Sequence, residues 1–356
     1  MTVRRTLSLL EGPQTLGRGP VFWSAFAVVV LTAAALPQFA SGFAVTNGSF
    51  LLAWVFMALG LSLLWGYTGV LSFGQTAFFG LAGYSYGVAS INFGGSAALT
   101  WVSFAIALAV PALFAAVLGY FMFYGGVRDV FLGIVTLSVT LVFETFMAQT
   151  AGPEWSIGSA RLNGFNGMSG MPPLSLRFGG REILFDGPPF FWLALALLVL
   201  TYLGLRILTN SGFGNVLVAI RENADRAEML GYDVRLYQLV AFVIASVLAA
   251  MSGVLYTLWG SYITPSSMGL TAAVLPIIWV ATGGKQDLTA TVVSTIAMLW
   301  VSQMLAVYGS QYALILMGGI LLTVVLWAPG GFVVSAVKAL GVRFRRRAAR
   351  AARGGS

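Results

Sequence analysis

The sequence contains no cysteine and no histidine, and charged residues make up only 8% of its 356 positions. Without cysteine the chain has no disulfide bond, thiol nucleophile or cysteine metal site. Without histidine it lacks the commonest general base and metal ligand. It also has no acidic pair at metal-ligand spacing and no Gly-x-x-x-x-Gly-Lys-[Ser/Thr] motif. We therefore expect no metal, no cofactor and no ATP bound through a P-loop.

Hydrophobic residues make up 58% of the chain, whereas a soluble domain is roughly a quarter charged. Too few polar residues remain to cover so much apolar surface in water. The sequence therefore predicts an all-α, polytopic helix bundle that has lipid as its solvent over most of its length.

Ten apolar segments reach or approach the ~20 residues that a membrane-spanning helix needs. The third is crowded with glycine and contains Gln75, while the eighth is short, contains Pro276 and ends in two glycines. Either is expected to be re-entrant or broken, which a membrane tolerates only where protein or water surrounds the backbone. The predicted spans are residues 21–40, 50–66, 70–91, 98–123, 130–149, 189–208, 236–258, 271–284, 288–306 and 312–328.

The basic residues predict the orientation of the chain. With the N-terminus inside, 16 of the 19 basic residues lie in the cytoplasm, as the positive-inside rule requires. Seven of them lie between Lys338 and Arg353, directly after an apolar span, which is typical of a cytoplasmic tail and not of a nucleic-acid-binding arm. The predicted regions are a cytoplasmic N-terminus (1–20), one transmembrane domain (21–335) and a basic cytoplasmic tail (336–356).

Two loops of the transmembrane domain are long. The outer loop (150–188) is rich in glycine, proline and asparagine, which predicts turns and short extended pieces without a core of their own. The cytoplasmic loop (209–235) contains a predicted amphipathic helix that starts at an N-cap, Asn215, and stops at Gly231. Its apolar stripe is Val216, Ile220, Ala224, Ala227 and Leu230.

Opposite charges four residues apart, Arg221 with Asp225 and Glu222 with Arg226, cover the other side of this helix. Two interpretations remain open on these residues alone. The helix could receive movement from an ATP-hydrolysing subunit, or it could rest on lipid headgroups or simply pack. Its balanced charges argue mildly against lipid, because interfacial anchors are usually rich in Lys and Arg.

Three stretches give the chain a family resemblance. The loop sequence Ser211-x-x-Gly214, Ala219-Ile-Arg-Glu-Asn223, Ala227-Glu-Met-Leu-Gly231 and Tyr237-Gln238 is similar to the cytoplasmic loop of ABC permeases for branched-chain amino acids. The glycine-rich segment from Gly60 to Val88 and the sequence Ala328-Pro-Gly-Gly-Phe332 resemble two further family segments. The chain departs from the family at Lys285-Gln-Asp-Leu-Thr289 and at Leu141, which bears on the substrate more than on the class of transporter.

The resemblance implies a non-catalytic permease subunit of an ATP-driven importer in the bacterial inner membrane, with both termini in the cytoplasm. It implies two ABC ATPase subunits, a second homologous permease, an extracytoplasmic substrate-binding protein and the lipid bilayer as partners, and no nucleic acid. Branched-chain or other hydrophobic amino acids are the implied substrates, and urea or short-chain amides, carried by near relatives, are the alternative. The implied ATPase-coupling residues are Asn215, Ile220, Arg221, Glu222, Asn223, Asp225, Arg226, Glu228 and Gly231.

Polar residues inside the predicted spans are candidates for a translocation path. Glu144 could meet a substrate ammonium group or pair with an outer-loop arginine, or it could make a structural hydrogen bond near the rim. Ser72, Gln75 and Thr76 could line the path, although the glycines around them also favour simple helix packing, as in the motif Gly83–Gly87.

The sequence alone leaves open two other functional classes and a second contact with an ATPase. A secondary transporter should have paired, interrupted spans with several intramembrane charges, and a membrane enzyme usually needs histidine or clustered acids, so both are less favoured. Lys285 and Asp287 are predicted to lie in a solvated turn, with a second ATPase contact as the alternative.

Overall fold

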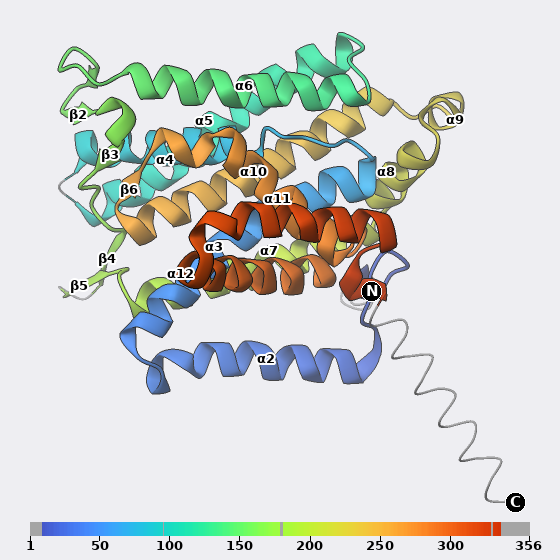
Figure 1. Ribbon diagram of the computed structural model, residues 1–356, viewed down its shortest axis with the longest axis horizontal. Helices are drawn as coiled ribbons and strands as arrows, with labels where there is room; N and C mark the ends of the chain where they lie inside the picture. The colour runs from blue at the N-terminus through green and yellow to red at the C-terminus, as the bar shows by residue number, and fades with distance from the viewer. Residues whose placement is uncertain (1–8, 95, 179–180, 329, 336–356) are drawn as a thin grey trace, which may run out of the picture.

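The computed structural model describes residues 9–94, 96–178, 181–328 and 330–335. The basic tail predicted at 336–356 lies outside these residues. Figure 1 shows helices lying side by side along one direction. One end of the bundle carries α8, α9 and the N-terminal segment from residue 9 on, and is called the α8–α9 end. The opposite end carries the strands and is called the strand end. The main helices are α2 (Gly19–Phe39), α3 (Gly42–Leu61), α4 (Gln75–Phe93), α5 (Ala97–Tyr124), α6 (Val130–Gln149), α7 (Pro188–Asn210), α8 (Gly212–Glu222), α9 (Ala224–Met229), α10 (Val234–Gly260), α11 (Leu270–Gly283) and α12 (Leu288–Trp327).

Within the described residues, seven helices are long and apolar enough to cross a membrane. They confirm the predicted polytopic helix bundle. The two segments predicted to be weak are irregular. The third starts with a non-helical stretch at residues 69–74, so that α4 begins only at Gln75, and the eighth contains the 14-residue helix α11. The seven spans are Gly19–Phe39, Gly42–Thr68, Ala97–Tyr124, Val130–Gln149, Pro188–Asn210, Val234–Gly260 and Leu288–Val307.

The second span starts eight residues before the predicted boundary, because Ser41 caps α3 by accepting a hydrogen bond from the N–H of Ala44 at 3.4 Å. Its far end is a π-helical turn, η1 (Ser62–Thr68), which stops at Gly69 in the left-handed region, with φ of +82°. π-helical turns are rare in proteins, and those that occur are often found at functional sites.

The helix α12 contains both the ninth and the tenth predicted spans. A straight helix of its 40 residues would be about 60 Å long, yet Gly331, just beyond its end, packs directly against Gly284, just before its start. The helix therefore doubles back, and Figure 1 shows its red part returning toward the end where its orange part begins. Met317 of the returning part is buried with Trp279 of α11.

Glycines allow the central helices to approach one another closely. Gly60 of α3 faces the carbonyl of Ala245 in α10, and Gly253 of α10 faces the carbonyl of Phe79 in α4, with no room for a Cβ atom in either place. Gly83, from the predicted packing motif, lies against the side-chain hydroxyl of Thr257 in α10. α3, α4 and α10 thus form the tightly packed centre of the bundle.

The outer loop contains the short extended pieces that its turn residues predict. Two antiparallel hairpins pair β1 with β2 and β4 with β5, and β3 pairs with β6 from the connection between α10 and α11. This last pair ties the outer loop to the short segment that leads through η3 (Pro265–Met268) into α11. The strands are β1 (Ser156–Ile157), β2 (Ala160–Arg161), β3 (Met168–Ser169), β4 (Ser175–Phe178), β5 (Arg181–Leu184) and β6 (Tyr262–Ile263), and η2 (Gly164–Asn166) lies between β2 and β3.

Candidate functional site: a surface helix pair and a buried polar segment

The loop helix predicted as one element is two helices that meet at Asn223. The backbone of Asn223 is extended (φ −163°, ψ 102°), and its side-chain oxygen accepts a hydrogen bond from the N–H of Arg226 at 2.8 Å. Because an asparagine side chain can compete with the helical backbone in this way, it ends α8 and starts α9. The predicted N-cap, Asn215, is wrong: it lies inside α8, which follows Ser211. The predicted stop is confirmed, since Gly231 has a φ of +89°.

The inner face of the pair packs on the bundle through most of the predicted stripe. Val216, Ile220 and Ala227 are buried together, with Tyr237 of α10 packed against them. The prediction is wrong for Leu230, which is 76% exposed, next to Met229 at 86%. These two apolar side chains lie at the end of α9, outside the membrane-spanning bundle, and Asp225, Arg226 and Glu228 are exposed on the same short helix. An exposed apolar pair rimmed by charges is typical of a contact surface for another protein.

The predicted ion pairs four residues apart do not form, because the break at Asn223 separates their members. Arg221 instead binds its neighbour Glu222, with 2.7 Å between the nitrogen and the oxygen, and Asp225 lies 3.9 Å from Arg128 in the turn between α5 and α6. The second pair is well exposed, so it adds little to stability.

Arg221 also links α8 to the membrane-spanning core. Its guanidinium donates a hydrogen bond to the carbonyl of Gly66, which lies in the π-helical turn η1. Its side-chain stem lies 3.2 Å from the position that a Cβ atom on Gly69 would take. The non-helical segment 69–74 begins at this glycine and leads to Gln75. A displacement of α8 would therefore act directly on the backbone that leads to the candidate path.

The candidate path residues Ser72, Gln75 and Thr76 are all buried, each at most 2% exposed. Ser72 Oγ accepts a hydrogen bond from the N–H of Gly74 at 3.1 Å, and Thr76 Oγ1 donates one to the carbonyl of Met268 at 3.4 Å. The side-chain amide of Gln75 differs from both, because neither its nitrogen nor its oxygen has a hydrogen-bond partner among the described residues. A buried amide without partners costs free energy, so it calls for a reason other than packing.

One face of α6 holds the non-helical segment in place. Thr136 Oγ1 accepts a hydrogen bond from the N–H of Phe73 at 3.1 Å, and Thr140 Oγ1 donates one to the carbonyl of Phe73 at 3.3 Å. Glu144 continues this face at the next position four residues on. The two threonines were missed in the sequence interpretation, although their regular spacing with Glu144 was a usable signal.

Glu144 is half-buried beside the start of α11. Its carboxylate lies against Gly269, the residue that precedes α11, so closely that a Cβ atom there would be 2.5 Å from Oε1. The carboxyl group thus lies near the first N–H groups of α11, which carry partial positive charge. Among the side chains that the structure describes, no arginine forms an ion pair with Glu144.

The sequence interpretation also missed a buried cation at the α8–α9 end. Arg206 of α7 is fully buried, and its guanidinium donates hydrogen bonds to the carbonyls of Leu10 and Gly17, both at 3.0 Å. The rings of Phe22 and Trp23 lie 4.8 and 5.0 Å from it. Arg206 thereby clamps the N-terminal segment across the end of the bundle. In the sequence, Arg206 was counted only among the cytoplasmic basic residues, and its burial was not predicted.

Comparison with known proteins assigns this arrangement to a family. A family model described as branched-chain amino acid transport system / permease component matches residues 43–325. The chain belongs to this family. The match contains η1, the buried polar segment and the helix pair α8–α9, and it leaves out α2 and the N-terminal segment that Arg206 holds.

Named relatives of this permease come from bacteria and an archaeon. The high-affinity branched-chain amino acid transport system permease protein LivM of Escherichia coli (strain K12) is 25% identical over 319 residues, which are 86% of this chain and 73% of that protein. A probable branched-chain amino acid transport permease protein LivM of Methanocaldococcus jannaschii is 27% identical over 186 residues, 48% of this chain and 53% of that protein. No solved structure matches the permease.

The permease has no metal-binding cluster in the ranges that the structure describes, since no three acidic, histidine or cysteine side chains gather there. Its site combines an exposed apolar pair at the α8–α9 end, a polar segment in the core, and a hydrogen bond from Arg221 to Gly66 in η1, the turn that precedes this segment.

Proposed function

We propose that this chain forms the translocation path of an ATP-driven importer for branched-chain or other hydrophobic amino acids, and that α8 and α9 receive the movement of an ABC ATPase. In this proposal the α8–α9 end faces the cytoplasm of a bacterial cell, across the inner membrane. The strand end faces outward, where the outer loop would meet a substrate-binding protein. A second, homologous permease and two ATPase subunits complete the assembly.

The observation that carries the proposal is the exposed pair Met229 and Leu230 at the tip of the helix pair. Lipid is an unsuitable cover for it, because the surrounding charges are balanced, whereas helices that rest on headgroups are rich in Lys and Arg. A groove of about 410 Å³ runs along α8 and α9, between these helices and the turn at residues 126–129. A protein surface with both apolar and charged groups fits this shape.

The natural absence of cysteine allows a clean test of the contact. A single Leu230→Cys substitution places one thiol at the tip of α9, and Ile183→Cys, on an exposed position of β5, is the matched control at the strand end. In membranes that contain the whole transporter, we expect a thiol-directed crosslinker to join Leu230→Cys, and not the control, to a protein with a P-loop motif. Labelling of Leu230→Cys by an impermeant reagent added outside intact cells would overturn the orientation and the coupling role together.

The substrate is tested by uptake in vesicles that contain the reconstituted complex. We expect ATP-driven uptake of radiolabelled leucine that is inhibited by isoleucine and valine and not by urea. Inhibition by urea or acetamide alone would assign the permease to the urea or short-chain amide class. Uptake by this chain alone without ATP would assign it to the secondary transporters instead.

A further inference from the structure

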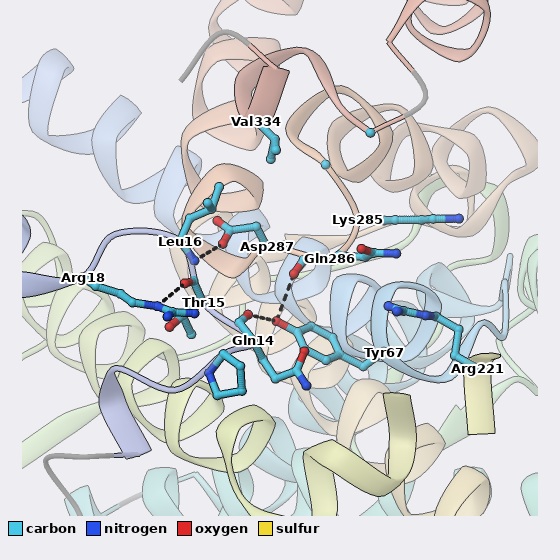
Figure 2. Close-up of a pocket in the computed structure, with 13 residues that line it drawn as sticks. Gln14, Thr15, Leu16, Arg18, Tyr67, Arg221, Lys285, Gln286, Asp287 and Val334 are labelled. Carbon is cyan, nitrogen blue, oxygen red and sulfur yellow. Dashed lines mark hydrogen bonds between the residues drawn. The ribbon is translucent and has the colours of Figure 1, made fainter. Parts of the chain in front are cut away.

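A polar cavity of about 350 Å³ lies at the α8–α9 end, apart from the buried polar segment. Figure 2 shows it between the N-terminal segment, Tyr67 of η1, Arg221 of α8 and the turn from Gly284 to Asp287. Val334, near the end of the described chain, closes one side. A water molecule occupies about 30 Å³ of liquid, so the cavity has room for an anion of several heavy atoms.

Cations outnumber acids in the lining of this cavity. Arg18, Arg221 and Lys285 are the lining residues with a positive charge, and Asp287 is the lining residue with a negative one. Both carboxylate oxygens of Asp287 are already bound to backbone N–H groups and not to the cations. Its Oδ2 accepts a hydrogen bond from the N–H of Leu16 at 2.6 Å, and its Oδ1 accepts one from the N–H of Ala290 at 2.7 Å.

Asp287 is therefore part of the frame of the cavity. At 5% exposure it caps α12 and holds the N-terminal segment, so the solvated turn predicted for this residue is wrong. Burial raises the pKa of its carboxyl above the ordinary value, while the backbone N–H groups of Ala290 and Leu16 act in the opposite direction.

Lys285 is the unmatched cation of the cavity. Its ammonium group lies 5.0 Å from the centre of the Trp65 ring, and no described acid or hydrogen-bond acceptor contacts it. Burial and the charge of Arg221 both lower its pKa. In Figure 2 the ammonium of Lys285 and the guanidinium of Arg221 lie on the same side of the cavity, with the Gln286 amide drawn between them. Two like charges held in one recess repel each other, and an anion between them would remove this cost.

We propose that this cavity is a binding site for a phosphate group, held by Lys285 and Arg221, with the Gln286 amide as a neutral donor. Lysine offers a free point charge. The guanidinium of Arg221 already donates to Glu222 and to the carbonyl of Gly66, so it contributes its positive charge and would share its donors with the phosphate. The phosphate can come from free inorganic phosphate or from the headgroup of an anionic phospholipid, since the cavity lies at the end of the membrane-spanning helices. A bound phosphate would join α8 to the turn between α11 and α12.

The test uses the full-length chain in nanodiscs of zwitterionic lipid and measures its thermal unfolding. Inorganic phosphate at constant ionic strength is expected to raise the unfolding temperature in a saturable way, and chloride is not. In a second arm, nanodiscs that contain phosphatidylglycerol are expected to give the same stabilisation without added phosphate if the headgroup is the source.

Variants connect the effect to the cavity. Lys285→Met keeps the length of the side chain and removes its charge, and we expect it to weaken phosphate binding at least about tenfold, which corresponds to about 1.4 kcal/mol. Lys285→Arg should retain binding, which shows that charge and not shape is needed. Arg226→Met, which removes an equal charge from the exposed face of α9, is the matched control and should bind like the wild type.

Lys285→Met and Arg226→Met each remove one positive charge and leave the basic tail unchanged, so a difference between these two variants arises in the cavity. Saturable stabilisation by phosphate or by phosphatidylglycerol that Lys285→Met abolishes supports the site and identifies its source. Equal stabilisation of Lys285→Met and wild type, an effect that follows ionic strength alone, or no effect in either arm would overturn the proposal.

Discussion

Replacing Gln75 by methionine should stabilise the described conformation and slow transport. Gln75 is 2% exposed, and both polar atoms of its amide lack a partner among the described residues. Methionine has nearly the same length and shape but no hydrogen-bonding group that needs a partner. Removing an unsatisfied buried polar group recovers about 1–3 kcal/mol of desolvation cost.

The same free energy shifts the balance between conformations of the transporter. If the amide of Gln75 finds partners only when the path opens, Gln75→Met stabilises the described conformation and loses hydrogen bonds in the open one. A difference of about 1–3 kcal/mol changes the ratio of two conformations by about 5- to 150-fold. We therefore expect a higher unfolding temperature in detergent together with slower ATP-driven leucine uptake in vesicles.

Tyr84→Phe is the matched control for this experiment. Tyr84 lies on the same helix, α4, is also 2% exposed, and its hydroxyl also lacks a partner among the described residues. It lies toward the strand end, away from the non-helical segment at 69–74, so its loss should stabilise the protein without slowing uptake. The reasoning is refuted if Gln75→Met lowers the unfolding temperature, or if it transports as fast as the wild type.

Three further variants test the contacts at the α8–α9 end. Exchanging the charges of Arg221 and Glu222 removes a charged hydrogen bond to Gly66, a contact that contributes about 1.5–3 kcal/mol; membrane insertion should stay normal while ATP-driven uptake is lost, and unchanged uptake would contradict coupling through Arg221. Arg206→Met should release the N-terminal segment, seen as faster amide hydrogen exchange over residues 9–18, and unaltered exchange would argue against the clamp. Asp287→Ala leaves two backbone N–H groups without their acceptor and should lower the free energy of unfolding by about 1–3 kcal/mol in denaturant titrations; an unchanged value would contradict its role as a cap.

The spans were predictable because one strong physical rule governs them. A helix in lipid must be long and apolar, so hydropathy alone located α6 at residues 130–149, as the structure has it. The irregularity of the third span was also predictable from the sequence. A polar side chain, Gln75, among several glycines is typical of a helix that starts inside the membrane. Which side chains fix such a break cannot be read from hydropathy, because the contacts come from Thr136 and Thr140, which lie far away in the sequence.

The loop was harder to predict because local and long-range forces compete there. Helical spacing favoured one continuous helix, but the Asn223 side chain offers the backbone a competing hydrogen bond, and it ends the first helix. That break rotates the following turn, so Leu230 points outward although it fits the apolar stripe. Burial of Arg206 was invisible for another reason. The N-terminal segment binds it through the carbonyls of Leu10 and Gly17, and every residue carries a carbonyl group.

The close contacts of Gly60 and Gly253 restrict how the permease can move. Where backbone meets backbone there is no side chain to change rotamer, and a sliding motion would strike carbonyl oxygens at once. α3, α4 and α10 must therefore travel as one rigid block. A switch between outward-open and inward-open conformations has to occur at the borders of that block. There α6, α11 and the doubled-back α12 pack on it through side chains that can change rotamer.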